Sequence, residues 1–400
     1  MTTIIDGNAN NLSVSDDSSN GDTIILGNGI DDTVSANSSS YDAITLGNGA
    51  GDTVSATGSN NDTITLGNGA GDTVVVSLYT STEFQVSSYD IITLGNGAGD
   101  IVNITGYEPS FNTITLGNGS GDVVNAASDE ETLSNTITLG NGSGDAVNAD
   151  GYSSFYNVIT LGNGAGDTVS LGRHSSFHDT VTLGNGAGDT VIAVSGFGGG
   201  DTITLGNGND DAVSFATAEY SSAAAKITLG NGAGDTVTAE GGGDTIMLGN
   251  GNQDTVIMQR GEGASTNNTI ILGNGNGDVV NDFDFQTLQN VALNNSITVG
   301  NGSDTIYVGN SDTITVGHGQ DSFVFEQTTP GTIGAVTVTG FNPANDVLNF
   351  NPALIANYAA AMVDTKQVGL DTVITVDATD TVTLTGVAAS HLTASNFHFS

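Results

Sequence analysis

The sequence predicts an all-β fold, a parallel β-solenoid or β-roll of about 20–24 residues per coil. The phrase Leu-Gly-Asn-Gly-x-x-Asp occurs twelve times, from residues 26–32 to residues 272–278. A β-branched run precedes and follows each copy, so each copy reads as strand, tight turn, strand. Successive copies lie 19 to 28 residues apart, and the variation falls in the other connection, where a solenoid accepts insertions.

Alternation within one coil predicts which side chains face inward. Ile64 and Leu66 share one face of the strand before the turn, and Val74 and Val76 share one face of the strand after it. The same positions are apolar in most of the other repeats. We therefore expect two short parallel sheets that enclose a narrow apolar core.

The turn itself has two expected features. The glycines on both sides of the asparagine are expected to supply the positive φ angles that a tight turn requires. The asparagines Asn28, Asn48 and Asn68 are expected to stack and to bond amide to amide between coils.

Composition limits the partners of the chain. The 400 residues contain 44 Asp and Glu but only 4 Lys and Arg, which gives a formal net charge of −40. Nucleic acid is therefore excluded, because phosphate binding requires clustered basic residues, and cations are the expected partners. The chain has no cysteine and no run of about 18 apolar residues, so we expect neither thiolate metal sites nor membrane insertion.

An aspartate ends every copy of the turn, and stacking would place these carboxylates about 4.8 Å apart. Like charges at that spacing require a counter-ion, and calcium accepts carboxylates and peptide carbonyls in irregular geometry. The alternative is that each aspartate only closes its turn by accepting hydrogen bonds from backbone amides. The candidate metal ligands in the repeats are Asp32, Asp52, Asp72, Asp100, Asp122, Asp145, Asp167, Asp189, Asp211, Asp235, Asp254 and Asp278.

A second acidic file precedes the first strand of each coil. Asparagine replaces aspartate in it at Asn112, Asn135 and Asn157, so we expect metal there only in some coils. The candidate ligands in this file are Asp22, Asp42, Asp62, Asp201 and Asp244.

Residues 299–325 contain two turns with the shorter spacing Gly-x-Gly-x-Asp, which end at Asp304 and Asp321. These turns resemble the nonapeptide Gly-Gly-x-Gly-x-Asp-x-U-x of the RTX family, in which U is a large aliphatic residue. The resemblance implies a parallel β-roll with several calcium ions bound between coils, and it adds Asp304, Asp312 and Asp321 to the candidate ligands. The turns of the main array are one residue longer than the family motif.

Three regions follow from these patterns: the long-turn solenoid over residues 1–298, the standard-spacing turns over 299–329, and a C-terminal cap over 330–400. Strands are expected at 336–339, 346–350, 371–376 and 381–384, and a short helix at 352–362. The last region resembles the type I secretion domain of RTX proteins. That resemblance implies export by the type I machinery through an uncleaved C-terminal signal. Such a signal would explain why the N-terminus lacks the basic segment and apolar core of a secretory signal peptide.

The functional hypothesis is a secreted, calcium-stabilised structural protein that polymerises head-to-tail or laterally into an extracellular filament, biofilm matrix or surface layer. No catalytic motif is found, so an enzyme is not expected. The alternative is an adhesin that binds ice through outward columns of threonine, such as Thr113 and Thr115, or binds a glycan through aromatic residues of the variable connections. Those aromatics form a contact surface or fold back over the edge of the roll, and the sequence leaves both possibilities open.

Overall fold

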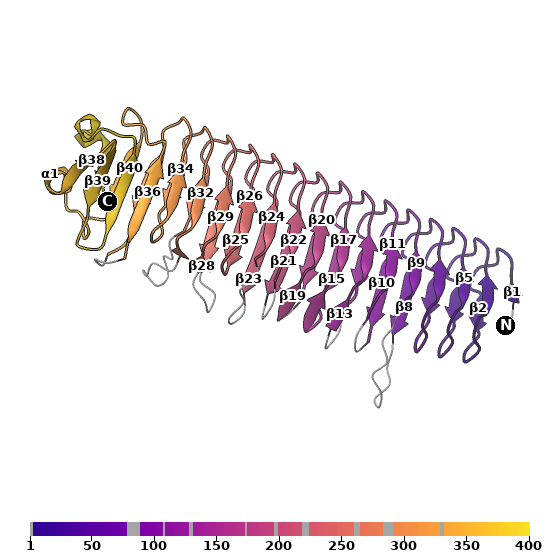
Figure 1. The fold of residues 1–400 in the computed structure, drawn as a ribbon. Helices are drawn as coiled ribbons and strands as arrows, with labels where there is room; N and C mark the ends of the chain where they lie inside the picture. The colour runs from indigo at the N-terminus through magenta and orange to yellow at the C-terminus, as the bar shows by residue number, and fades with distance from the viewer. Residues whose placement is uncertain are drawn as a thin grey trace. The chain divides into compact units, whose positions relative to one another are not determined.

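A computed structural model describes residues 3–77, 89–106, 109–127, 131–172, 174–195, 199–217, 224–259, 265–282, 292–328 and 332–400. The chain divides into two compact units, Met1–Gly208 and Asn209–Ser400, which we call unit 1 and unit 2. Each unit is built almost entirely of short parallel strands, so the predicted β-solenoid is confirmed (Figure 1). In both units we call the sheet before the glycine turn the first sheet, and the sheet after it the second sheet.

The described residues of unit 1 form ten strands of the first sheet, nine of the second, and a short third ladder beside the variable connections. The first-sheet strands are β1 (Thr3–Ile5), β3 (Thr23–Ile25), β5 (Ala43–Thr45), β7 (Thr63–Thr65), β9 (Ile91–Thr93), β11 (Thr113–Thr115), β14 (Thr136–Thr138), β17 (Val158–Thr160), β20 (Thr180–Thr182) and β22 (Thr202–Thr204). The second-sheet strands are β2 (Ser13–Ser15), β4 (Thr33–Ser35), β6 (Thr53–Ser55), β8 (Thr73–Ser77), β10 (Ile101–Thr105), β12 (Val123–Asn125), β15 (Ala146–Ala149), β18 (Thr168–Leu171) and β21 (Thr190–Ser195). The third ladder is β13 (Glu131–Leu133), β16 (Ser153–Phe155) and β19 (Ser175–Phe177).

Unit 2 repeats this arrangement and adds the only antiparallel pairings among the described residues. The first-sheet strands are β24 (Lys226–Thr228), β26 (Thr245–Met247), β29 (Thr269–Ile271), β32 (Ser296–Thr298), β34 (Thr313–Thr315), β36 (Ala335–Thr339) and β40 (Thr381–Thr385). Strands β39 (Asp371–Thr375) and β38 (Thr365–Val368) follow β40 in antiparallel order. The second-sheet strands are β23 (Ala212–Thr217), β25 (Thr236–Glu240), β27 (Thr255–Gln259), β30 (Val279–Asn281), β33 (Thr305–Tyr307), β35 (Ser322–Phe325), β37 (Val347–Phe350) and β41 (Phe397–Phe399). The remaining elements are β28 (Ser265–Thr266), β31 (Ala292–Leu293), α1 (Tyr358–Val363), η1 (Ala389–His391) and η2 (Ala394–Asn396).

Equivalent residues of successive coils pair directly. In the first sheet Ile114 pairs with Ile137, and in the second sheet Val102 pairs with Val124. The middle residue of each repeat strand points inward, and the leucine that opens the turn adds a second inward residue. Ile64, Leu66 and Val74 are at most 2% exposed, so the predicted alternation and core are confirmed.

The C-terminal 70 residues match the predicted strands to within a few residues, whereas the helix is shorter than expected. Helix α1 begins only at Tyr358, because the Asn357 side chain caps it by accepting a hydrogen bond from the Ala360 amide at 3.0 Å. Residues 351–357 form turns instead, in which the Asn351 carbonyl accepts from the Leu354 amide.

No helix within the described ranges has both the length and the apolar character needed to cross a membrane.

Candidate functional site in two buried acidic columns

The aspartates that end the glycine turns lie in register as predicted, and we call them the turn column. They are fully or almost fully buried, with at most 2% of each residue exposed. In unit 1 the column consists of Asp32, Asp52, Asp72, Asp100, Asp122, Asp145, Asp167 and Asp189. In unit 2 it consists of Asp211, Asp235, Asp254, Asp278, Asp304 and Asp321, so the standard-spacing turns continue the same column.

Each turn-column carboxylate accepts a hydrogen bond from the coil before it. The Asp32 amide donates to Asp52 Oδ1 at 2.9 Å, and the Asp100 amide donates to Asp122 Oδ1 at 3.0 Å. In unit 2 the Asp254 amide donates to Asp278 Oδ1 at 3.1 Å. The bonding of aspartate to backbone amides, one of the two possibilities that the sequence left open, is therefore present, and it uses one oxygen of each carboxylate.

The second oxygen of most of these carboxylates has no such partner. It is buried, and no donor within the described part of the chain reaches it. This holds for the Oδ2 atoms of Asp32, Asp52, Asp72, Asp100, Asp122, Asp145, Asp167, Asp235, Asp254, Asp278, Asp304 and Asp321. A buried ionised oxygen without a partner is costly, so a proton or a cation at these atoms stabilises the folded chain.

Burial makes these carboxyl groups hard to ionise. Desolvation raises the pKa of Asp72, Asp100 and Asp122 to about 6, and the adjacent aspartates raise it further against the lowering effect of the amide bonds. In unit 2 the same causes raise the pKa of Asp254 and Asp321 to about 7. Asp72, Asp100, Asp122, Asp254 and Asp321 thus exchange protons close to neutral pH when no cation is bound.

The second acidic file also forms a register column, which we call the flank column. Its members are at most 2% exposed. In unit 1 they are Asp22, Asp42, Asp62, Asp90, Asn112, Asn135, Asn157, Asp179 and Asp201, and in unit 2 they are Asp244, Asn268, Asn295 and Asp312 after Ala225. Asp312, which the resemblance to standard turns had added as a ligand, belongs to this column.

Aspartate and asparagine play the same part in the flank column. The Asp42 amide donates to Asp62 Oδ1 at 2.9 Å, and the Asn112 amide donates to Asn135 Oδ1 at 3.0 Å. The second oxygens of Asp42 and Asp201 accept hydrogen bonds from Ser39 Oγ and Ser176 Oγ, whereas those of Asp62, Asp90, Asp179 and Asp244 have no donor among the described residues. A side-chain oxygen, rather than a negative charge, is what this position requires.

In most coils the residue before each column member has a positive φ angle. Before the turn column this residue is usually glycine, as in Gly51 and Gly71 with φ of 75° and 72°. The prediction that the Gly-Asn-Gly glycines supply the positive φ is therefore wrong. Those glycines are needed for space, because a Cβ on Gly49 would lie 1.5 Å from the Gly29 carbonyl oxygen.

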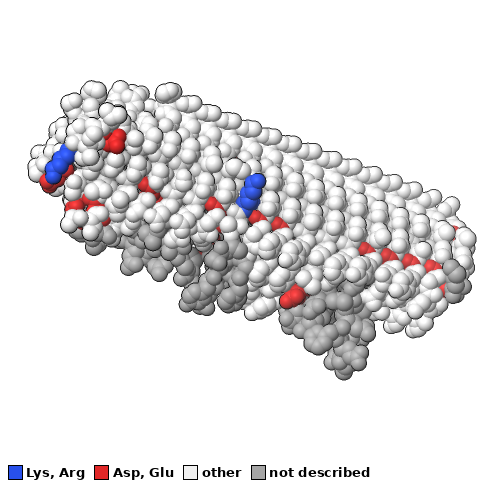
Figure 2. Space-filling view, in the orientation of Figure 1, with Lys and Arg blue, Asp and Glu red and all other residues white. Residues whose placement is uncertain are grey.

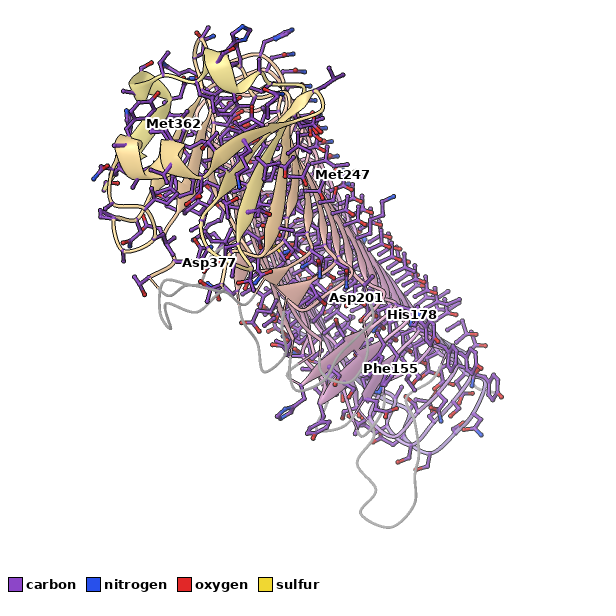
Figure 3. All side chains as sticks on the ribbon, turned by 60° about the vertical axis from the view of Figure 1, so that its left-hand side comes forward. Phe155, His178, Asp201, Met247, Met362 and Asp377 are labelled. Atoms are coloured by element: carbon purple, nitrogen blue, oxygen red, sulfur yellow. The ribbon has the colours of Figure 1, made fainter. Side chains whose placement is uncertain are left out.

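The asparagine of the turn forms the predicted ladder. Asn68 Nδ2 donates to Asn48 Oδ1 at 2.9 Å, and the Asn68 amide donates to the same oxygen at 2.9 Å. Figure 3 shows the resulting regularity, with equivalent side chains in rows along each unit.

Sequence reasoning missed two members of these networks. Asp346 continues the turn column, because the Asp321 amide donates to its Oδ1 at 3.0 Å, yet no Gly-Asn-Gly precedes it. Asp282 occupies an inward position that is apolar in other coils, and Asn295 Nδ2 donates to both of its oxygens at 3.1 and 2.9 Å. Burial and the nearby Asp312 raise the Asp282 pKa well above its usual value. An aspartate breaking an apolar file was the signal available for Asp282.

At the flank corner of unit 1 several aromatic residues take the left-handed position. Tyr89 stacks on Phe111 with ring centroids 5.1 Å apart, and Tyr156 stacks on His178 at 5.2 Å. Phe155 and Phe177 stack in the third ladder, at 4.5 Å; Phe155 and His178 are labelled in Figure 3. Stacked rings cover one another's faces and leave edges to solvent, which suits a structural ladder. Five further aromatics considered from the sequence, Tyr79, Phe84, Tyr107, Phe197 and Tyr220, lie outside the described residues.

The columns fit a calcium ion only in part. Most coils supply one carboxylate oxygen without a described donor, next to peptide carbonyls of the glycine turn. Across the residues that the structure describes, however, no three His, Asp or Glu side chains converge on one point. A search against models of known protein families and a search of curated proteins find no match to this chain.

Proposed function

We propose that this chain is a secreted, calcium-stabilised structural protein of the RTX type, which assembles into an extracellular filament, matrix or surface layer. The fold supports a structural role because its buried polar groups serve to join one coil to the next. The aspartate, asparagine and amide ladders all connect equivalent residues of adjacent coils. Such a molecule gains stability by stacking repeats.

One observation carries the calcium part of the proposal: the turn column keeps aspartate in every coil although asparagine forms the same ladder elsewhere. The sequence holds only 4 Lys and Arg against 44 Asp and Glu, so protein cations are too few to neutralise the column. Calcium supplies positive charge to the Oδ2 atoms of residues such as Asp72, Asp100 and Asp122, with peptide carbonyls as further oxygen donors.

Secretion follows from the same reasoning. A cation that binds only the folded chain adds its binding free energy to folding. An acidic chain of this kind stays unfolded where calcium is scarce and folds where it is abundant, which suits export as an unfolded chain by a type I system.

The test is a calcium titration of the full chain at pH 8, monitored by circular dichroism and electron microscopy. We expect chelator to yield a largely unfolded chain, millimolar calcium to produce β structure and ordered assemblies, and magnesium to be much less effective. A chain that is fully β in chelator, with an unchanged melting temperature after calcium addition, would contradict the calcium part. A folded chain that stays monomeric in calcium would contradict assembly.

The matched variants are Asp122→Asn in the turn column and Asp42→Asn in the flank column, where Ser39 already donates to the second oxygen. Both keep the Oδ1 acceptor and remove one buried carboxylate. We expect Asp122→Asn to reduce the calcium-induced rise in melting temperature and Asp42→Asn to leave it nearly unchanged. Equal effects of the two substitutions would mean that calcium does not distinguish the columns.

A further inference from the structure

The outward face of the first sheet in unit 1 is far more regular in sequence than the outward face of the second sheet. Over β3 to β22, 14 of the 18 outward positions are threonine, and the others are Ile25, Ala43, Ile91 and Val158. None is charged. In the orientation of Figure 2 the surface over these strands is uncharged apart from a narrow row of acidic residues.

The threonines form two straight columns because the strands pair without any register shift. Thr113 pairs with Thr136 and Thr115 with Thr138, and the same pattern links every neighbouring pair from β3 to β22. The columns therefore repeat about every 4.8 Å along the stack and lie about 6.6 Å apart across it. A methyl group and a hydroxyl group recur at each point of this two-dimensional array.

Strand propensity does not explain the array. The second sheet of the same coils has the same strand spacing, but of the two equivalent outward positions on each strand from β4 to β21 only 5 of 16 are threonine, and most of these positions are half-buried rather than exposed. The remaining positions are Ser, Val, Ile, Asn and Ala. A preference for β-branched residues in strands would act on both sheets alike.

The two faces also use their polar groups differently. On the second sheet Asn125 Nδ2 donates to Asn103 Oδ1 at 2.8 Å, and Asn148 Nδ2 donates to Asn125 Oδ1 at 2.7 Å. On the first-sheet face none of the threonine hydroxyls of β3 to β22 bonds to another described protein group. These hydroxyls are therefore available to water in a fixed, repeating arrangement.

We infer that this threonine face of unit 1 binds ice. A repeating, uncharged array of methyl and hydroxyl groups fits a repeating, uncharged lattice, in which water covers the methyl groups and bonds to the hydroxyls. A second copy of the chain is a poor occupant of this face, because its outward positions carry neither the aromatic anchors nor the charged groups on which protein interfaces depend. The inference does not depend on calcium or on self-assembly.

Two threonines of one coil provide a matched test. Thr160 lies outward on the first sheet, Thr168 lies outward on the second sheet, and both are exposed. Thr160→Lys places a charge in the array, whereas Thr168→Lys places the same charge on the irregular face. Thr115→Lys, near the centre of the array, is the stronger disruption. Circular dichroism melting of each variant shows whether the solenoid remains folded.

The measurements are thermal hysteresis and inhibition of ice recrystallisation by the folded, full-length chain in calcium-containing buffer. We expect activity in the wild type, loss of most of it in Thr115→Lys and Thr160→Lys, and retention in Thr168→Lys. An inactive folded wild type would overturn the inference, as would equal activities of Thr160→Lys and Thr168→Lys. Sedimentation with an insoluble neutral polysaccharide, abolished by Thr115→Lys in a chain without hysteresis, would assign the face to a glycan instead.

Discussion

The turn column and the flank column of unit 1 both link successive coils through a side-chain oxygen, but they differ in the residues that supply it. Both place a side-chain oxygen after a left-handed residue and use it to accept the amide of the preceding coil. The flank column tolerates asparagine at three consecutive coils, whereas the turn column keeps aspartate throughout. The ladder therefore does not require a charge, and the invariant charge of the turn column indicates a second task, which we attribute to a bound cation.

Removing that cation should make stability depend on pH, and this is the largest expected effect because nearly every coil contributes. The folded-state pKa values of Asp72, Asp100 and Asp254 are raised to between about 6 and 7. Because their pKa is raised, these carboxyl groups keep their protons in the folded chain at pH values where the unfolded chain, which titrates near pH 4, has released them. The protonated carboxyl groups therefore contribute their full stability to the folded state below pH 4, and this contribution is lost as the pH rises through 6 to 7. In chelator, the melting temperature should fall between pH 5 and pH 8. A melting temperature that is constant or rises over that interval would contradict the assignment.

Gly119 tests whether the glycine turn has less space for a side chain than the corner at the flank column. A Cβ there would lie 1.5 Å from the Gly97 carbonyl oxygen, whereas the flank corner accepts residues as large as Tyr156. We expect Gly119→Ala to lower the free energy of unfolding by about 3 kcal/mol or more, since backbone must move. Gly121→Ala is the control: its Cβ meets open space but requires a φ of 74°, which costs about 1 kcal/mol. Similar losses in denaturant unfolding would show that conformation, rather than space, limits this turn.

The substitution Asn135→Asp tests whether the flank column rejects charge. Asn135 Nδ2 donates to the Pro109 carbonyl at 3.0 Å and to Asn157 Oδ1 at 3.1 Å, and a carboxylate would face both acceptors without a donor. We expect a loss of about 2 kcal/mol at pH 8, from the unsatisfied groups, and a smaller loss at pH 5, where the carboxyl carries a proton. Unfolding at the two pH values is the measurement. An equal loss at both would mean that the charge is irrelevant there.

The smallest effect is expected at the exposed asparagine ladder. Asn118→Ala removes the Oδ1 atom that accepts from the amide and from Nδ2 of Asn141, at 2.9 and 2.8 Å. Because water replaces much of this bonding, the loss should be about 1 kcal/mol. Ser120→Ala is the comparison variant: it removes only the longer bond that Ser120 Oγ accepts from the Ser143 amide, at 3.2 Å, and alanine occupies the equivalent position in other coils, such as Ala98. Unfolding that leaves Asn118→Ala identical to the control would show that the exposed ladder does not stabilise the turn.

The fold and the turn column could be predicted from the sequence because each position of the repeat occurs many times with the same residue type. Period-two alternation predicts the burial of Ile64 and Val74, and one aspartate per copy predicts a register column. Single-copy features are different. Asp346 joins the turn column without its motif, and Asp282 lies among core positions. Their places depend on which coil each strand stacks upon, which no local pattern specifies.

The role of the Gly-Asn-Gly glycines could not be predicted from the sequence. The distance between their backbone and the neighbouring coil depends on how the coils stack, not on the sequence of the turn itself. A sequence motif shows that glycine is required, but conformation and close approach produce the same requirement. Only the neighbouring carbonyl, 1.5 Å from a hypothetical Cβ on Gly49, distinguishes them.

The bonds of the aspartate columns all run the same way: an amide of the earlier coil meets a carboxylate of the later one. The asparagine ladder runs the other way, with the amide of the later coil donating to the earlier one, so the two sides of any cross-section through such a stack are chemically different. Two solenoid ends of this kind are complementary only in the same orientation, so a polymer joined end to end would be polar, with one end chemically distinct from the other.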